Sequence, residues 1–147
     1  DENISFFVDY AHTSKSLQSL LEGIKYKYSN LSSNIITIFG CGGNRDVAKR
    51  ASMGSIAEKY SNTIILTDDN PRNEDPKEII QDICLGISDK NKIIIIHNRK
   101  RAIRKAISIA KINDIVVLAG KGNEDVIIYG ARAVKHNDLE YLRSVIK

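Results

Sequence analysis

Residues Ile35–Asp46, with the sequence I-I-T-I-F-G-C-G-G-N-R-D, give the clearest indication of the fold. Its first five residues, Ile35–Phe39, are apolar or β-branched without polar alternation, which is typical of a strand covered on both faces of a sheet. Glycines at positions 40, 42 and 43 then end the strand in a loop. We therefore expect a buried strand of a parallel sheet that runs directly into a glycine-rich turn.

Four further apolar runs have the same character, and segments with helical spacing separate them. The runs are Ile4–Val8, Thr63–Thr67, Ile93–Ile96 and Ile115–Leu118. Helical segments follow Thr13, the Asp75-Pro76 pair with its reach-back Glu78, and Asn137. Another carries the apolar stripe Ala102, Ile103, Ala106, Ile107 and Ala110. Because strands and helices alternate, we predict an α/β fold over residues 1–147: one Rossmann-like domain with an open, mostly parallel sheet and helices on both faces.

Composition narrows the classes of protein to which the chain can belong. Hydrophobic residues make up 42% of the 147 residues and charged residues 27%, as in ordinary soluble domains. No apolar run approaches the roughly 18 residues that a membrane span needs, so we expect none. The chain opens with Asp1 and Glu2 where a secretory leader would carry positive charge, and it lacks an initiator methionine. We therefore expect no signal peptide, and a fragment or processed form.

Cysteine usage and net charge add two expectations. Cys41 and Cys84 are too few for a disulfide framework, which favours a cytoplasmic location, and no nearby histidine motif would activate Cys41 as a nucleophile. The net charge of +4 suits anionic small molecules such as nucleotides. The basic run Arg99–Arg101, with Arg104 and Lys105, has no interleaved aromatics, so we interpret it as the solvated outer face of a helix and predict no nucleic-acid partner.

Polar loops follow four of the predicted strands. They are Asp9–Thr13, Gly40–Asp46, Asp68–Arg72 and Ala119–Asp125. The carboxyl ends of parallel strands share one edge of the sheet, and ligands bind there in open α/β folds. We therefore predict that these loops converge on one ligand site.

The glycine loop allows two interpretations. Gly40–Gly43 is either an ordinary strand-to-helix turn or a cradle in which backbone N–H groups bind an anion, helped by Arg45, Lys49 and Arg50. It matches neither the phosphate-binding loop nor the dinucleotide fingerprint.

The Asp69-Asn70-Pro71-Arg72 stretch is either a plain turn or a receptor for a zwitterionic amino acid. In the second case Arg72 grips a carboxylate in bidentate fashion while Asp69 or Asn70 receives an ammonium. For His12 the sequence favours a satisfied core histidine over a base, and we expect His97 and His136 to be structural. No His/Cys cluster has metal-ligand spacing, so no metal site is predicted.

Together the four loops resemble the C-terminal domain of the Mur ligases, most closely that of the diaminopimelate-adding members. The matching stretches are V-D-Y-A-H-T, F-G-C-G-G-N-R-D-x-x-K-R, T-D-D-N-P-R-N-E-D-P and A-G-K-G-N-E-D, in family order over residues 8–125. Asn123 stands where the family usually has histidine, which leaves open whether a polar contact near Glu124 changes.

The resemblance implies an ATP-dependent amide ligase of peptidoglycan biosynthesis that adds meso-diaminopimelate to UDP-N-acetylmuramoyl-L-alanyl-D-glutamate. ATP and Mg²⁺ activate a carboxylate as an acyl phosphate, which the incoming amine attacks. The resemblance implies ATP contacts at Asp9, His12 and Arg45, and diaminopimelate contacts at Arg45, Asp69, Asn70, Arg72, Gly120 and Glu124.

The resemblance assigns this domain no catalytic residue. The central ATPase domain, over which this domain closes and which binds most of the ATP and magnesium, lies outside the chain, as does the N-terminal UDP-binding domain. We therefore expect no turnover from the chain alone. The alternatives are a lysine-adding Mur ligase or a folylpolyglutamate synthetase, both disfavoured by the D-N-P-R form, or a non-catalytic amino-acid or nucleotide-binding module.

Overall fold

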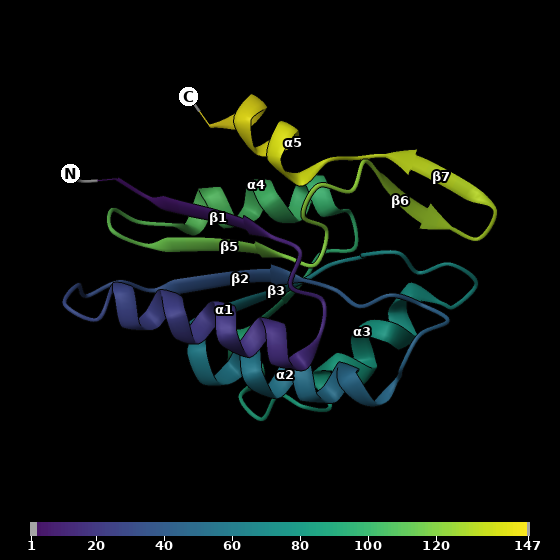
Figure 1. The fold of residues 1–147 in the computed structure, drawn as a ribbon, viewed down its shortest axis with the longest axis horizontal. Helices are drawn as coiled ribbons and strands as arrows, with labels where there is room; N and C mark the ends of the chain where they lie inside the picture. Colours follow the sequence, from purple (N-terminus) through teal and green to yellow (C-terminus); the bar gives the residue numbers. More distant parts are fainter. Residues whose placement is uncertain (1–2, 147) are drawn as a thin grey trace.

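A central parallel sheet lies between two groups of helices in the computed structural model, which describes residues 3–146 (Figure 1). In chain order the elements are β1 (Ser5–Asp9), α1 (Ser14–Lys27), β2 (Ile35–Phe39), α2 (Ala48–Tyr60), β3 (Thr63–Leu66), α3 (Pro76–Cys84), the short 3₁₀ helix η1 (Lys90–Lys92), β4 (Ile93–Ile95), α4 (Arg99–Ile109), β5 (Ile115–Ala119), β6 (Val126–Tyr129), β7 (Arg132–Lys135) and α5 (Asp138–Val145).

The five-stranded sheet has the order β1-β5-β2-β3-β4, and every neighbouring pair is parallel. Residues 115–119 of β5, an interior strand between β1 and β2, are buried throughout, as the unbroken apolar run predicted. The register pairs Asp9 of β1 with Ala119 of β5, and Phe39 of β2 with Leu66 of β3. The strands therefore end at nearly the same level, and the loops that follow them share one edge.

Alternate residues of each strand pack against opposite helix layers, because successive side chains of a strand point to opposite faces. Phe39, Leu66 and Val117 belong to the core beneath α1, α2 and α3. The core on the other face, beneath α4 and α5, includes Ile38 and Leu118. Burying one such side chain contributes about 1.5–3 kcal/mol. The predicted α/β architecture with helices on both faces is confirmed.

The predicted helix starts are confirmed, with one correction. Asp75 caps α3 by accepting a hydrogen bond from the Lys77 N–H, with Pro76 in the first turn. The expected reach-back from Glu78 does not form, and over residues 3–146 the reciprocal capping box lies instead at Thr13 and Ser16, at the start of α1. No helix of residues 3–146 is long and apolar enough to cross a membrane.

Two features differ from the sequence prediction. The first is the antiparallel hairpin of β6 and β7, a separate two-stranded sheet that was not expected. The second is Arg99, which we placed on the outer face of its helix. It is buried instead and forms an ion pair with Asp138 of α5, with the Arg99 Nη2 atom 2.7 Å from the carboxylate. The other cations of that helix are exposed as predicted.

Candidate functional site

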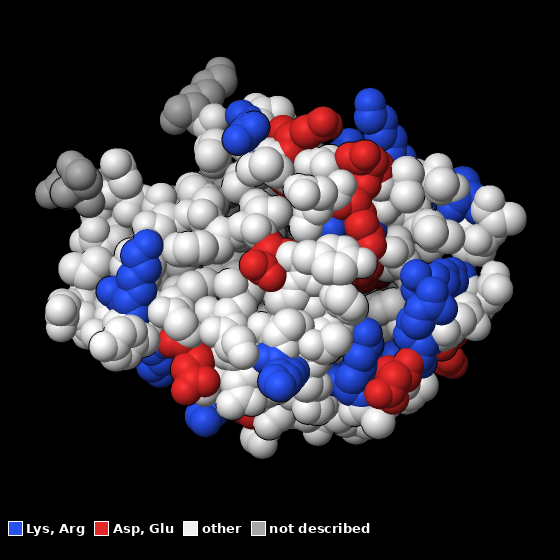
Figure 2. All heavy atoms as spheres, in the orientation of Figure 1, with Lys and Arg blue, Asp and Glu red and all other residues white. Residues whose placement is uncertain are grey.

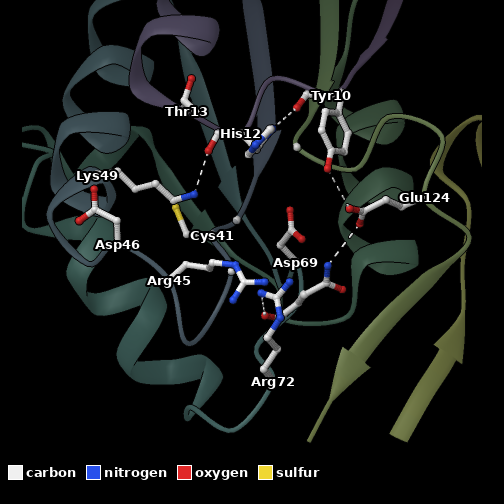
Figure 3. Close-up of a pocket in the computed structure, with 14 residues that line it drawn as sticks. Tyr10, His12, Thr13, Cys41, Arg45, Asp46, Lys49, Asp69, Arg72 and Glu124 are labelled. Carbon is white, nitrogen blue, oxygen red and sulfur yellow. Dashed lines mark hydrogen bonds between the residues drawn. The ribbon is translucent and has the colours of Figure 1, made fainter. Parts of the chain in front are cut away.

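A cavity of about 410 Å³ opens where β1, β2, β3 and β5 end (Figure 3). All four polar loops contribute to it, as predicted. Its lining residues are Tyr10, His12, Thr13, Gly40, Cys41, Gly42, Arg45, Asp46, Lys49, Asp69, Asn70, Arg72, Gly120 and Glu124. On the face drawn in Figure 2, cationic and anionic side chains lie beside one another toward the end at which the strands terminate.

Most of the predicted site residues line this cavity, and Asp9 is the exception. Asp9 lines two more open hollows beside the cavity, one with Lys15 and one with Asn123. Its carboxylate accepts a hydrogen bond from the Ala11 N–H at 2.8 Å. His12 is exposed at the cavity rim, with its Nδ1 atom 2.8 Å from the Tyr10 carbonyl oxygen. Within residues 3–146 His12 makes no hydrogen bond with a carboxylate, and because it is exposed the favoured interpretation as a core histidine is wrong.

The glycine loop and the Asp68–Arg72 loop are joined through their backbones. The Gly43 N–H donates to the Asn70 carbonyl oxygen at 2.8 Å. A Cβ atom at Gly43 would lie 1.8 Å from the Pro71 carbonyl oxygen, so no other residue fits without displacing the loop. Asn44 adds two bonds, donating its N–H to Glu74 and accepting from the Asn73 N–H. Gly43 is therefore required for close loop packing.

Arg50 contacts the backbone of the glycine loop and does not line the cavity. Its side chain is 2% exposed and pairs with Glu74 at 2.7 Å and with Asp82 at 2.9 Å. It also donates to the Gly42 carbonyl oxygen at 3.2 Å. The prediction that Arg50 helps to bind an anion is therefore wrong. Of the three cations predicted near this loop, only Arg45 and Lys49 line the cavity.

Arg72 is fixed at both its backbone and its side chain. Its φ of 53° is left-handed, a conformation that costs a non-glycine residue about 1–3 kcal/mol. The Arg72 N–H donates to the Ile128 carbonyl oxygen at 3.0 Å, and the Gly130 N–H donates to the Arg72 carbonyl oxygen. The Nη1 atom donates to the carbonyl oxygens of Gly43 and Asn70. Nε and Nη2 have no hydrogen-bond acceptor within residues 3–146 and stay available to a ligand.

Asp69 supplies the opposite charge. Its side chain is 9% exposed, lines the cavity and accepts no hydrogen bond from the part of the chain that the structure describes. The Lys121 Nζ atom lies 3.7 Å from Asp69 Oδ1. Burial raises the pKa of Asp69, and the nearby cations Arg99 and Lys121 oppose that shift. A poorly solvated carboxylate without donors is suited to accept a ligand ammonium group.

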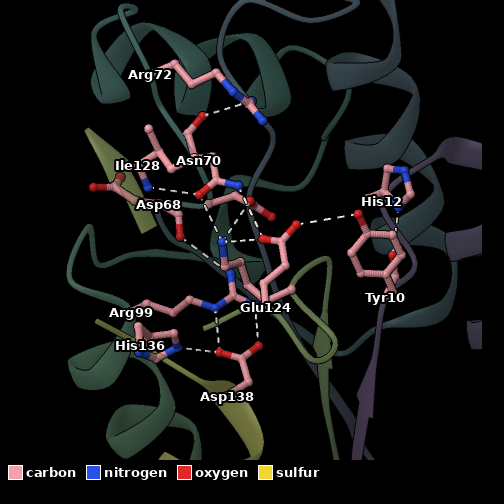
Figure 4. Close-up of polar contacts among 12 residues, drawn as sticks. Tyr10, His12, Asp68, Asn70, Arg72, Arg99, Glu124, Ile128, His136 and Asp138 are labelled. Carbon is pink, nitrogen blue, oxygen red and sulfur yellow. Dashed lines mark hydrogen bonds and ion pairs between the residues drawn. The ribbon is translucent and has the colours of Figure 1, made fainter. Parts of the chain in front are cut away.

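Lys121 is a site residue that the sequence analysis missed. It is completely buried, and its Nζ atom donates to Asn70 Oδ1 at 2.9 Å and to Glu124 Oε2 at 2.6 Å. The Ile128 N–H also donates to Asn70 Oδ1, so both lone pairs of that oxygen are used (Figure 4). The suggestion that Asn70 receives an ammonium is therefore corrected: Asn70 holds the site together. The signal in the sequence was a lysine between two glycines at a strand end.

A second polar network lies behind the cavity and includes the structural histidines. Arg99 forms two hydrogen bonds with the Asp138 carboxylate and donates to the Ala119 carbonyl oxygen. His136 Nε2 lies 2.6 Å from the same carboxylate, and His97 Nδ1 lies 2.8 Å from Asp68 Oδ1. The Arg99 guanidinium holds the pKa of Asp138 well below its ordinary value in spite of burial. Neither histidine lines the cavity, in agreement with their predicted structural role.

The donor set does not fit a magnesium ion. Within residues 3–146 no group of three His, Cys, Asp or Glu side chains could hold a metal. The carboxylate of Glu124 is paired with Lys121, and Asp69 lies near the same ammonium.

Comparison with known proteins shows the family to which the chain belongs. The family model described as "Mur ligase, glutamate ligase domain" matches residues 1–122. A relative from Aquifex aeolicus (strain VF5) is 49% identical over 124 residues, which are 84% of this chain and 25% of the relative. A relative from Rickettsia rickettsii is 47% identical over 149 residues, covering 99% of this chain and 30% of the relative. Both are named UDP-N-acetylmuramoyl-L-alanyl-D-glutamate--2,6-diaminopimelate ligase.

Solved structures agree with this result. One described by the same ligase name is 39% identical with a TM-score of 0.89, and the match covers 98% of this chain and 29% of that one. A bifunctional folylpolyglutamate synthase/dihydrofolate synthase from Yersinia pestis is 12% identical with a TM-score of 0.61 over 78% of this chain and 25% of that one, which shows a shared fold alone. The chain spans about 25–30% of the length of the curated relatives named above. Because the family model matches residues 1–122, more than half of the chain, this chain belongs to the Mur ligase, glutamate ligase domain family.

Proposed function

We propose that this chain is the C-terminal domain of an ATP-dependent ligase that joins meso-diaminopimelate to UDP-N-acetylmuramoyl-L-alanyl-D-glutamate in peptidoglycan biosynthesis. One observation carries the proposal: opposite charges line a single cavity. The guanidinium groups of Arg45 and Arg72 lie on one side and the carboxylate of Asp69 lies on the other. An amino-acid head group carries the complementary carboxylate and ammonium.

The proposed contacts follow from the unused hydrogen-bonding capacity. Arg72 keeps Nε and Nη2 for a carboxylate of the ligand, and Arg45 lies on the same side of the cavity. Asp69, and Glu124 through its Oε1 atom, receive the ammonium, while the backbone at Gly120 forms the floor near Asp69. Each charge-assisted bond contributes roughly 1.5–3 kcal/mol once it is shielded from water.

Diaminopimelate is favoured over lysine because it carries an amino-acid head at each end. Its distal head has the carboxylate that lysine lacks. Lysine in the same cavity would leave the Arg72 guanidinium without an anion, and unpaired buried polar groups give steep selectivity. Asn70 contributes by holding Lys121 and the Ile128 N–H, which keeps the site in shape.

ATP is proposed to lie at the side of the site formed by Asp9 and His12, with Arg45 close to both ligands. Lys49 binds the His12 carbonyl oxygen at 3.0 Å and adds positive charge to this rim. The amine of diaminopimelate attacks an acyl phosphate, so the role of this domain is to hold the amine donor and to close over the nucleotide. ATP activation, with magnesium, is assigned to a central domain, and the UDP group to an N-terminal domain, in the part of the protein beyond this chain.

The two free cysteines, Cys41 and Cys84, fit the reducing cytoplasm, where the proposal places the enzyme. The alternative of a folylpolyglutamate synthetase has only the shared fold in its favour.

Substitution of Arg72 in the full-length ligase tests the proposal. We expect Arg72→Ala and Arg72→Lys to raise the KM for diaminopimelate tenfold or more, about 1.4 kcal/mol or greater, with the KM for ATP little changed. Lysine keeps the charge but loses the planar fork. Arg101→Lys, on the exposed face of α4, is the matched control. An unchanged KM for diaminopimelate would show that Arg72 does not bind it. Equal use of lysine by the unaltered enzyme would show that the substrate assignment is wrong.

A further inference from the structure

The hairpin of β6 and β7 is bonded directly to the loop that carries Arg72. The Ile128 carbonyl oxygen accepts from the Arg72 N–H, and the Gly130 N–H donates to the Arg72 carbonyl oxygen. The Ile128 N–H donates to Asn70 Oδ1 at 3.0 Å. These bonds form a short parallel bridge between Arg72 and Tyr129. The hairpin therefore extends the backbone of the Arg72 turn on the side away from the cavity.

The hairpin makes few apolar contacts with the rest of the domain. All of β7 is exposed, and in β6 only Ile127 is buried. Figure 1 shows the hairpin projecting beyond the end of the main sheet. Its position therefore depends strongly on polar contacts with the body of the domain.

Tyr129 makes such a contact at the point where the hairpin meets Arg72. Its hydroxyl donates to Asp68 Oδ2 at 2.8 Å, and Asp68 Oδ1 lies 2.8 Å from His97 Nδ1. Asp68 is itself buried, two residues after the end of β3, so its position is fixed. The contact joins the hairpin to the same loop whose backbone the hairpin supports.

The hydrogen bond between Tyr129 and Asp68 affects ligand binding through the backbone conformation of Arg72. A left-handed φ is unfavourable for arginine and persists only where surrounding contacts enforce it. If the hairpin moved, the two backbone bonds to Arg72 would weaken, and the turn could relax toward a right-handed conformation. The guanidinium would then leave its place beside the carbonyl oxygens of Gly43 and Asn70.

We propose that Tyr129, anchored on Asp68, is a positioning residue that sets selectivity for an amino acid with a second carboxylate, by holding the hairpin that fixes Arg72. Tyr129 lies outside the residues that line the cavity, so it acts through Arg72 and not on the substrate. The inference rests on the proposed function.

Kinetics of the full-length ligase with Tyr129→Phe test the inference, because this change removes only the hydroxyl. We expect the KM for diaminopimelate to rise about three- to tenfold, the KM for ATP to stay within about twofold, and the preference for diaminopimelate over lysine to fall. Tyr26→Phe is the matched control, since the Tyr26 side chain is 85% exposed.

A double-mutant cycle separates positioning from general loosening of the fold. In an Arg72→Ala background, Tyr129→Phe is expected to change the KM for diaminopimelate less than twofold. Equal rises in the KM for diaminopimelate and the KM for ATP, or additive effects of the two substitutions in the cycle, would overturn the inference. If Tyr129→Phe gives no folded enzyme, Gly130→Ala weakens the same support, because it strains a φ of 58° while the added Cβ meets no atom closer than 3.9 Å, and the same selective rise is expected.

The substrate preference of the wild-type enzyme tests the proposed function separately from the positioning role of Tyr129. No preference for diaminopimelate over lysine in the wild type would contradict the proposed function itself. A clear preference that Tyr129→Phe leaves unchanged would contradict the positioning role alone.

Discussion

Replacing Lys121 with methionine tests the buried ion group at the centre of the site. Methionine keeps an unbranched side chain of similar length but removes the ammonium. Asn70 Oδ1 would keep only the Ile128 N–H, and Glu124 Oε2 would lose its bond of 2.6 Å. Asp69 would lose its cation at 3.7 Å. We therefore expect Lys121→Met to destabilise the domain and to weaken amino-acid binding together.

The expected loss is about 2–4 kcal/mol at neutral pH. Removing one partner of a buried ion pair typically costs about 3–5 kcal/mol, because the other charge is left without compensation. The Lys121 side chain is fully buried, but that of Glu124 is 33% exposed. Water can therefore solvate Glu124 in the variant, which places the loss toward the lower end. Lys105→Met, on the exposed face of α4, should change stability by less than about 0.5 kcal/mol.

The loss should also depend on pH, because Asp69 contributes to it. Burial holds the folded pKa of Asp69 above its ordinary value of 3.8, and Lys121 opposes that shift. An acid whose folded pKa is raised destabilises the fold as the pH rises from its unfolded value through its folded one. Without Lys121 the folded pKa rises further. The gap between variant and wild type should therefore be smallest near pH 3.8 and should widen toward neutrality.

Urea denaturation of the 147-residue chain, followed by circular dichroism at several pH values, measures this gap. A loss below about 1 kcal/mol at pH 7, or a gap that is constant with pH, would refute the assigned role of Lys121. In the full-length enzyme the same variant should raise the KM for diaminopimelate more than that for ATP.

Three further outcomes are expected. Asp138→Asn should cost about 3–5 kcal/mol at neutral pH. The folded pKa of Asp138 lies below its ordinary 3.8, so its contribution is present above that value and is lost as the pH falls, and urea titrations should show the gap closing in acid. Burial raises the pKa of Cys41 to about 12, so at pH 8 iodoacetamide should label the partly exposed Cys84 first and Cys41 only after denaturation, as read by mass spectrometry. The chain alone should show no ATP hydrolysis or ligation, and phosphate release above background from a clean preparation would contradict this.

The sheet and the convergence of its loops could be predicted because both follow from local patterns. Unbroken apolar runs such as Ile35–Phe39 indicate buried parallel strands, and the carboxyl ends of such strands share one edge. Placing Arg45, Arg72 and Glu124 in one cavity needed no further information. The hairpin was missed because β7 buries no apolar residue, so its sequence carries no strand periodicity with a covered face.

The buried charges could not be predicted because their partners are distant in the chain. Arg99 lies 39 residues from Asp138, Arg50 lies 32 from Asp82, and Lys121 lies 51 from Asn70. A basic residue in a helix is exposed in most proteins, so local spacing favours the wrong interpretation for Arg99. Only the fold brings Asp138 to Arg99, Asp82 to Arg50 and Asn70 to Lys121, although Glu124, the paired carboxylate of Lys121, lies just three residues along the chain.

The neighbours Asp68 and Asp69 show how partner contacts separate a supporting residue from a binding one. Asp68 has both its oxygens occupied, by His97 and Tyr129, so it has little capacity left for a ligand. Asp69 has a cation near it but no hydrogen-bond donor among the described residues. The unused capacity of the cavity is therefore anionic at Asp69 and cationic at Arg72. A ligand with only an amine or only an acid would leave one of them unpaired, so this cavity favours a zwitterion over either.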